Sequence, residues 1–460
     1  MNLNIQKNDI SKNDILKNNI QKVNIIGAGL AGCECAHILA SNGIKVCLYE
    51  MKKIKKNEAQ SSENFAELVC SNSLKSERLT NACGLLKKEM SMLNSLIIEA
   101  AYKSKVPAGQ ALAVDRDKFS EYITKSISND KNIQVIDKEI DDIDKLDGIV
   151  VIATGPLTSK SLFDNISKKI SDDSLYFYDA AAPIITAESI DMNIAYIKDR
   201  YGDDDKTGDY LNLPMNKEQY LGFYEALINA QEAPRHEFDK LVLFKDCMPI
   251  EQMAKYGQDT MLFGPLKPVG LNNPTTGQKN YAVVQLRAEN EEKTLYNMVG
   301  FQTSLKFSEQ KRVFSMIPGL ENAEFVRYGV MHKNIYINSS KLLDNKFCLK
   351  QDKDIYFAGQ ISGVEGYIES AASGLMVAYN ILSRLNGKEF ELDDTTMLGS
   401  LAKYISSPNI NFQPMNANFG IIKPLELKIK NKKQKYELYA KRSLDYMNEL
   451  IQKLGIKEVS

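Results

Sequence analysis

The sequence is poor in the residues that build metal sites and disulfide frameworks. It has three histidines and seven cysteines in 460 residues, and no two cysteines form a CxxC pair. An odd number of cysteines without a repeating spacing argues against a disulfide framework. So few histidines, without a CxxC, argue against a zinc site. We therefore expect no structural metal.

Long apolar runs and a strong net charge are also missing. No apolar stretch approaches the roughly 20 residues that span a bilayer, and the first 21 residues lack the apolar centre of a secretory signal. The net charge of −1 gives no global attraction to nucleic acid, so any RNA contact must come from local patches. The sequence therefore predicts a protein of the reducing cytoplasm that does not span a membrane.

The clearest motif present is a glycine-rich turn between two apolar strands. Residues 22–26 form the first predicted strand, Gly27-Ala28-Gly29-Leu30-Ala31-Gly32 follows, and a helical pattern leads to a second strand that ends on Glu50. This order is typical of the βαβ unit that binds dinucleotides. Gly27 permits the tight turn, Gly29 lets the backbone approach a pyrophosphate, and Gly32 allows close helix–strand packing. The helix N-terminus faces the phosphates, and Glu50 accepts hydrogen bonds from the ribose. The alternative is a glycine-rich turn without a ligand.

Two later segments favour FAD over NAD as the dinucleotide. Ala153-Thr154-Gly155 ends an apolar strand and resembles the second signature of two-domain flavoproteins. Asp354–Gly363 resembles their third signature, which reaches the flavin end of the cofactor. We therefore expect Thr154, Gly155, Gly359 and Gln360 to contact FAD. The third signature commonly reads Gly-Asp. Here Gln360 follows Gly359, so the carboxylate of that aspartate is absent from this position. The alternative for this segment is a buried strand followed by a helix of small residues.

These motifs predict an α/β fold: a two-domain flavoprotein with a Rossmann-like FAD-binding domain and an inserted α+β domain. Residues 1–21 repeat isoleucine every five residues, from Ile5 to Ile20. That period fits neither a helix nor a strand, so we expect a flexible extension. The FAD-binding domain is expected in two parts, residues 22–180 and 345–460, the second with C-terminal helices. Residues 181–344 hold short β-rich pieces and their own turn signals, and form the expected insertion.

Two cysteines stand in surroundings that differ from those of the others. Cys70 lies in AELVCSNSLKS and is followed by Lys75 and Arg78, cations that could lower the pKa of a thiol. Cys247 lies in LVLFKDCMPIE, where a strand-like run ends at a proline. For each residue the pattern alone favours a buried structural cysteine over a functional one.

Many longer runs resemble the folate- and FAD-dependent tRNA (uracil-C5) methyltransferases, across residues 22–445. They include GAGLAGCECA, AELVCSNSLKS, CMPIE, FGPLKPVGL, FAGQISGVEGYIESAASGL and NFQPMNANFG. The resemblance implies that reduced FAD carries a methylene group from 5,10-methylenetetrahydrofolate to uracil C5 in the T loop of tRNA, with NAD(P)H as the reductant. It also implies that Cys70 and Cys247 are the functional cysteines. We expect Cys247 to add to uracil C6. Cys70 is expected to remove the C5 proton or to protect the flavin as an adduct in the resting enzyme.

The sequence offers only weak candidates for the RNA and folate contacts. Three basic clusters are candidates for RNA: Lys52, Lys53, Lys55 and Lys56; Lys75, Arg78, Lys87 and Lys88; and Lys428, Lys430, Lys432, Lys433 and Lys435. The alternative for each cluster is a solvated lysine-rich surface. Candidates near the folate are Tyr281, Gln285, Arg287, Asn416 and Asn418.

Other functions remain open on the sequence alone. The same chemistry could act on a ribosomal RNA uridine. The chain also resembles the larger flavoenzyme that modifies the wobble uridine of tRNA, although that enzyme has a helical C-terminal domain missing here. From another class, the chain could be an NAD(P)H:flavin oxidoreductase for a small molecule, or a flavin-binding interaction protein. The presence of both Cys70 and Cys247 argues against the last possibility.

Overall fold

The structure is a computed structural model of the chain. It describes residues 22–57, 60–170, 175–180, 182–200, 208–233, 248–274, 277, 279–289, 293–329, 331–387, 390–409 and 412–456. The expected N-terminal extension and Cys247 lie outside these described residues.

The larger of two units is built on a six-stranded sheet in the order β16-β17-β7-β1-β2-β6. Its strands are β1 (Val23–Ile26), β2 (Val46–Glu50), β6 (Ile133–Asp137), β7 (Ile149–Ile152), β16 (Cys348–Leu349) and β17 (Asp352–Phe357). All neighbouring strands are parallel except β16, which runs antiparallel to β17. β1, β2 and β7 are buried at every residue, as expected for a parallel sheet covered on both faces.

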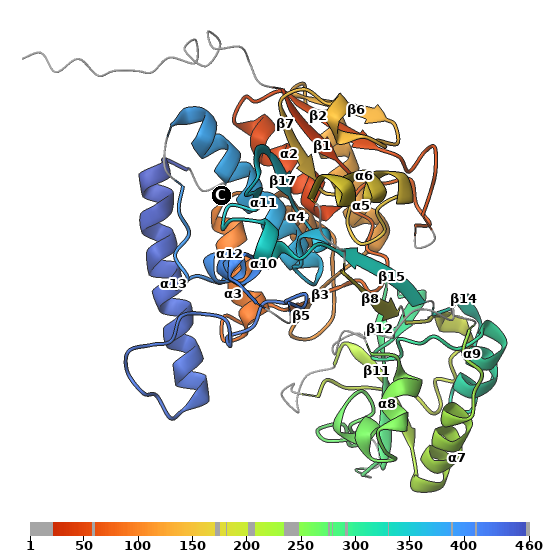
Figure 1. Ribbon diagram of the computed structural model, residues 1–460. Helices are drawn as coiled ribbons and strands as arrows, with labels where there is room; N and C mark the ends of the chain where they lie inside the picture. The colour runs from red at the N-terminus through yellow and green to blue at the C-terminus, as the bar shows by residue number, and fades with distance from the viewer. Residues whose placement is uncertain are drawn as a thin grey trace, which may run out of the picture.

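The helices of this unit cover the sheet and extend beyond it. They are α2 (Leu30–Ser41), α3 (Ala82–Met92), α4 (Leu96–Lys103), α5 (Arg116–Ser128), α6 (Lys160–Ile170), α10 (Ser339–Leu342), α11 (Tyr367–Asn386), α12 (Met397–Ser406) and α13 (Lys432–Leu454). α11 packs along α2, so the late part of the chain closes over the first glycine-rich turn. α13 runs along the outer side of the unit, next to α3 (Figure 1).

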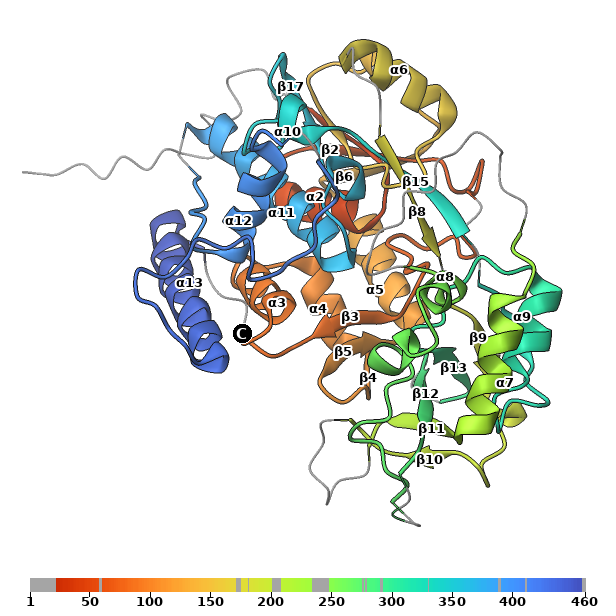
Figure 2. The ribbon, with the colours of Figure 1, turned by 60° about the horizontal axis from the view of Figure 1, so that its bottom comes forward.

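The second unit has its own antiparallel sheet, in the order β10-β11-β12-β13-β9-β14. Its strands are β9 (Ile184–Thr186), β10 (Tyr196–Ile197), β11 (Tyr210–Met215), β12 (Ala282–Ala288), β13 (Leu295–Met298) and β14 (Phe325–Arg327), and its helices are α7 (Lys217–Ile228), α8 (Ile250–Lys255) and α9 (Phe307–Phe314). Figure 2 shows α7 and α9 beside this sheet. In the sequence, this unit lies between the two parts of the first.

Two small sheets complete the architecture. β8 (Leu175–Ala180) pairs antiparallel with β15 (Met331–Tyr336), and this ribbon carries the chain into the second unit and back (Figure 1). β3 (Ser73–Ser76), β5 (Ala111–Val114) and β4 (Lys105–Val106) form a three-stranded antiparallel sheet on the side of the first unit that faces the second (Figure 2).

The apolar side chains divide into two main cores. One extends from β1 to α13, and the other lies between Ile185 and Ala323 in the chain. Ile337, Leu342 and Leu343 pack in the first core, just before the expected start of the second FAD-binding segment. The expected α/β class, with a Rossmann-like domain and an inserted α+β domain, is confirmed. In the described part of the chain, no helix has the length and apolar character needed to cross a bilayer.

A buried carboxylate joins α2 to α4 in the larger unit. Glu34 in α2 is fully buried, and one of its oxygens accepts the N–H of Ile97 at 2.9 Å, in the first turn of α4. Its other carboxylate oxygen has no hydrogen-bond partner among the described residues. Burial raises the pKa of Glu34 to about 8, although hydrogen bonds from the start of α4 oppose the shift. The folded protein therefore keeps this carboxyl group protonated at neutral pH.

We expect Glu34 to make the protein less stable as the pH rises. The unfolded chain releases this proton near pH 4.5 and the folded chain near pH 8. The folded state thus binds more protons between these values, and its free energy of unfolding falls across that window by up to about 5 kcal/mol. Glu34→Gln keeps the shape of the side chain and an acceptor for the N–H of Ile97. It should remove the contribution of Glu34 to the fall of the free energy of unfolding with pH. Urea unfolding of both proteins from pH 5 to 8 measures it, and parallel curves would contradict the prediction.

Candidate functional site

A pocket opens at the carboxyl edge of the larger sheet. β1, β2, β7 and β17 all end there. The chain continues from β1 to β2 on one side of the sheet, and β7 is added later on the other side of β1, so the strand order reverses at this point. In open α/β sheets this crevice is the usual ligand site. Ten of the eleven residues expected to contact FAD line it: Gly27, Ala28, Gly29, Leu30, Ala31, Glu50, Thr154, Gly155, Gly359 and Gln360. Three signatures far apart in the sequence therefore meet at one site.

The eleventh residue, Gly32, lies behind the pocket wall and packs helix α2 against the turn. A Cβ atom on Gly32 would stand 1.9 Å from the carbonyl oxygen of Gly27. Gly27 has a φ of +101°, and its Cβ would stand 2.6 Å from the carbonyl oxygen of Ala153. A Cβ on Gly29, in contrast, would have no protein atom within 4 Å. Gly29 therefore leaves space that the protein itself does not fill.

The two helices that begin at the pocket have no side-chain cap, whereas five other helices of the larger unit have one. α3, α4, α5, α12 and α13 each begin at a side chain that accepts a backbone N–H, from Asn81, Ser95, Asp115, Thr396 and Asn431. The N-cap residues of α2 and α11 are Gly29 and Gly366, and neither helix has a side-chain cap. The first N–H groups of a helix need an outside partner and favour an anion. This arrangement fits a pyrophosphate at α2 and a polar edge of a flavin at α11.

The acidic residue at the end of β2 is held at the pocket wall. One oxygen of Glu50 accepts the N–H of Ala28 at 2.7 Å, and the other accepts the N–H of Lys52 at 2.9 Å. The carboxylate is thus fixed beside the glycine-rich turn, where a ribose could donate to its remaining lone pairs. At the third signature, the side-chain amide of Gln360 donates to the buried carboxylate of Glu365. A carboxylate therefore lies next to Gln360, although the sequence lacks the usual aspartate.

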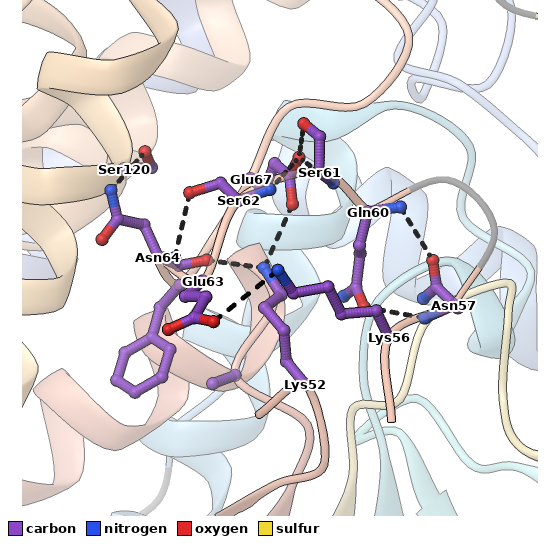
Figure 3. A network of polar contacts seen from close by, with 12 residues as sticks. Lys52, Lys56, Asn57, Gln60, Ser61, Ser62, Glu63, Asn64, Glu67 and Ser120 are labelled. Atoms are coloured by element: carbon purple, nitrogen blue, oxygen red, sulfur yellow. Dashed lines mark hydrogen bonds and ion pairs between the residues drawn. The ribbon is translucent and has the colours of Figure 1, made fainter. Parts of the chain in front are cut away.

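A polar network fixes the loop after β2 across one side of the pocket (Figure 3). Lys52 donates to the carbonyl oxygen of Asn64 at 2.6 Å and pairs with Glu67 at 3.2 Å. Burial acts against ionisation of Glu67, but hydrogen bonds from Ser61 and Ser62 and the charge of Lys52 hold its pKa below the usual value. Lys52 is only 3% exposed. The candidate role of Lys52 in binding RNA was therefore wrong, because this lysine is part of the pocket wall.

Cys70 lies beside the pocket, next to Tyr367, the first residue of α11. It follows Val69, which lines the pocket, and its backbone N–H donates to the phenol oxygen of Tyr367 at 2.6 Å. The N–H of Ser71 donates to the same oxygen at 3.2 Å. Burial, together with the negative charge of a Cys70 thiolate, raises the pKa of Tyr367 well above its usual value. Tyr367 therefore keeps its proton and holds the Cys70 backbone as a neutral group.

Two half-buried arginines place positive charge near Cys70. Arg116, at the start of α5, interacts with Cys70 and forms an ion pair of 2.6 Å with Glu289 of the inserted domain. Burial and the nearby Arg116 charge lower the pKa of Arg327, which also interacts with Cys70. Reactive cysteines occur in such electropositive surroundings. Cations distant in the chain leave no local pattern, so the sequence indicates only the nearby Lys75 and Arg78 as the cations beside Cys70.

Hydrogen bonds tie the Cys70 loop to the inserted domain. The guanidinium of Arg287, in β12, donates to Asn72 at 2.9 Å and to Ser71 at 2.7 Å. The amide of Asn72 donates in return to the carbonyl oxygen of Ala288 at 2.8 Å. The position of Cys70 therefore depends on where the inserted sheet lies.

The remaining folate candidates occupy varied places. Tyr281 packs against the inserted core, with its ring 5.4 Å from that of Tyr220. Gln285 accepts from Arg200 and donates to Asn212 within the inserted unit. Asn418 shapes a turn by accepting the N–H of Gly420. Arg287, in contrast, contacts the loop that carries Cys70 through its side chain.

Asn416 belongs to a loop that packs against the first turn of α11. The neighbouring Ala417 donates its N–H to Glu369 at 3.0 Å. This contact brings residues 415–418 next to the helix that begins at the pocket. Among the described residues, no group of three or more histidine, cysteine, aspartate or glutamate side chains is placed to hold a metal ion.

The fold and the pocket define a two-domain flavoprotein with a discontinuous dinucleotide-binding domain. Residues 22–389 match the family model described as glucose inhibited division protein A. Two crystal forms of Aquifex aeolicus GidA share the fold, with TM-scores of 0.67 and 0.65 and 17% and 16% identity. They cover 95% of this chain, which covers 78% and 76% of theirs.

Relatives with much higher identity define the family more narrowly. A Fusobacterium nucleatum protein named methylenetetrahydrofolate–tRNA-(uracil-5-)-methyltransferase TrmFO is 57% identical over 427 residues, covering 93% of this chain and 98% of the relative. A protein of the same name from Acetivibrio thermocellus is 55% identical over 430 residues, with the same coverage. The chain belongs to the family of methylenetetrahydrofolate–tRNA-(uracil-5-)-methyltransferases.

Proposed function

We propose that this chain forms 5-methyluridine in the T loop of tRNA, as a methyltransferase that depends on folate and FAD. The observation that carries this proposal is the high identity with methyltransferases of that name along nearly the whole length of both chains. The substrates are 5,10-methylenetetrahydrofolate and tRNA, with NAD(P)H as the reductant. Because tRNA is the substrate, we propose that the protein acts in the cytoplasm.

The pocket residues suit the parts of FAD in order. The uncapped N-terminus of α2, at Gly29, would hold the pyrophosphate, and Glu50 would hold the ribose of the ADP half. Thr154, Gly155, Gly359 and Gln360 line the same pocket and would contact the remainder of the cofactor. When bound, FAD supplies a reducible carrier for the methylene group. The protein would fix this carrier beside Cys70, next to Tyr367.

The two cysteines would act on the uracil. Uracil C5 is a poor nucleophile until a group adds to C6, and a thiolate is suited to that addition because it can later be expelled. We assign the addition to Cys247, which precedes α8 by only a few residues. Cys70 would take the proton from C5 once the new carbon–carbon bond has formed. Arg116, Arg327 and the proton-bearing Tyr367 would support a thiolate at Cys70.

Transfer of a labelled one-carbon unit tests the function directly. The purified protein would be incubated with methylene-labelled 5,10-methylenetetrahydrofolate, NAD(P)H and an unmodified tRNA transcript. We expect label in the T-loop uridine and none in a ribosomal RNA transcript. Transfer to ribosomal RNA alone would show that the substrate is ribosomal RNA and not tRNA. Label arriving from S-adenosylmethionine in place of folate would reject the proposal.

A further inference from the structure

In the structure, the three basic clusters of the sequence differ in how far their lysines are buried or paired with acidic groups. In the first, Lys52 is buried, while Lys53, Lys55 and Lys56 form ion pairs with Asp137, Glu139 and Glu63. In the second, Lys75 pairs with Glu369, and Lys87 is buried and donates to the carbonyl oxygen of Leu74 at 2.7 Å. Burial lowers the pKa of Lys87 to about 8. Most of these lysines are thus engaged within the protein.

The third cluster differs because, among the residues that the structure describes, its lysines pair with no acidic side chain. The stretch Lys428–Lys435 holds five lysines and no aspartate or glutamate. Four of these lysines are exposed and Lys435 is half-buried. Within the described chain, none of the five pairs with a carboxylate, although Lys432 and Lys435 lie 5.6 and 5.5 Å from the ring centres of Tyr436 and Tyr439. This segment therefore presents uncompensated positive charge to the solvent.

Two sets of hydrogen bonds hold the backbone that carries this charge. Asn431 caps α13 by accepting the N–H of Gln434 at 3.1 Å. Farther along α13, the guanidinium of Arg442 donates to the carbonyl oxygens of Lys423 and Pro424, just before the cluster. The lysines at the start of α13 also lie at the positive end of the helix dipole. The charge is thus presented from a defined position.

The cluster is connected to the pocket through the chain and through packing. Residues 415–418, which bind the first turn of α11, precede it by about ten residues. α13 also packs on α3, where Ser443 donates to the buried carboxylate of Glu89 at 2.5 Å. Lys88 on α3 and Arg78 just before it are exposed and pair with no carboxylate in the described chain. Figure 1 shows α3 and α13 side by side.

We propose that Lys428–Lys435, with Arg78 and Lys88, form the surface that binds the phosphate backbone of the RNA substrate. This inference rests on the proposed function. A chain with a net charge of −1 must gather cations locally to bind a polyanion. Lysine carries a compact point charge on a flexible stem, which suits phosphate contacts that carry no sequence information. The surface would therefore anchor the RNA while another part of the site selects the uridine.

Two matched quadruple variants test this surface. The first is Lys428→Ala, Lys430→Ala, Lys432→Ala and Lys433→Ala. The control is Lys103→Ala, Lys125→Ala, Lys145→Ala and Lys160→Ala, which removes the same charge from exposed lysines that each pair with a nearby acid. The Kd for the tRNA transcript would be measured from 50 to 300 mM salt. FAD content and kcat at saturating tRNA would be measured in parallel.

We expect the first variant to weaken tRNA binding roughly 30-fold or more near 150 mM salt, and to reduce the slope of log Kd against log salt by about 3. Its FAD content and kcat should match those of the control. An unchanged Kd and an unchanged slope in the first variant would overturn the inference. The inference would also fail if this variant lost binding to anionic lipid vesicles but bound tRNA fully. Either result could coexist with normal methylation by the wild type. Absence of tRNA methylation by the wild type would instead reject the proposed function.

Discussion

Gly29→Ala is expected to yield a stably folded protein that has lost FAD. The new Cβ would meet no protein atom within 4 Å, and Gly29 has a φ of −75°, which alanine adopts without strain. The methyl group would instead occupy the space where a pyrophosphate must approach the first turn of α2. A contact of that kind costs on the order of 3 kcal/mol, or about 100-fold in FAD affinity. Flavin content after purification and the Tm of the apoprotein measure the two effects separately.

Two further glycines provide comparisons for this result. Gly222→Ala, in α7 of the inserted domain, places its Cβ 4.0 Å from the nearest side chain, so it should keep both flavin and stability. Gly32→Ala should lose both, because its Cβ would collide with the carbonyl oxygen of Gly27 at 1.9 Å. A Gly29→Ala protein with a full complement of FAD would show that the pyrophosphate lies elsewhere.

Cys247→Ala is expected to abolish methylation while FAD stays bound. Without the thiolate that adds to C6, uracil C5 does not become nucleophilic, so the rate should fall by at least about three orders of magnitude, or ~4 kcal/mol in the barrier. The variant should also fail to form a covalent complex with RNA that contains 5-fluorouracil. Cys70→Ala should likewise lose methylation but still form that complex, because it would lack only the base.

A cysteine from the core serves as the control for both variants. Cys348 lies in β16, is buried, and should tolerate alanine with only a modest loss of stability. If Cys247→Ala methylates tRNA at the wild-type rate, the assignment of the nucleophile fails. If Cys70→Ala forms no complex with the 5-fluorouracil RNA while Cys247→Ala does, the two roles are exchanged.

The sequence predicted those features that depend on short stretches of chain. The turn at Gly27–Gly32 and the strand ending on Glu50 are local patterns, and their residues meet in the structure as the motif requires. The three flavoprotein signatures converge for the same reason, since each places a turn at the end of a parallel strand. The strands themselves are continuous apolar runs, which predict a buried sheet.

Features made by contacts between distant residues could not be predicted in this way. Lys52 and Lys87 read as surface charges, yet their partners, Glu67 and the carbonyl oxygen of Leu74, come close only after folding. Arg116 and Arg327 reach Cys70 from two different domains. The contacts of Arg287, a folate candidate from the sequence, with Asn72 and Ser71 also join distant parts of the chain. A single sequence carries no pattern that pairs such positions.

The ribbon of β8 and β15 also bears on how the chain was assembled. Ala180 and Met331 are directly paired across it, and the pairing continues to Leu175 and Tyr336. The point where the chain leaves the larger unit thus lies beside the point where it returns. A short hairpin turn could join the two strands and leave the parallel sheet and its pocket covalently continuous. The inserted domain is therefore modular in the topological sense, so an ancestral dinucleotide-binding protein could have acquired it in one step without rerouting its own strands.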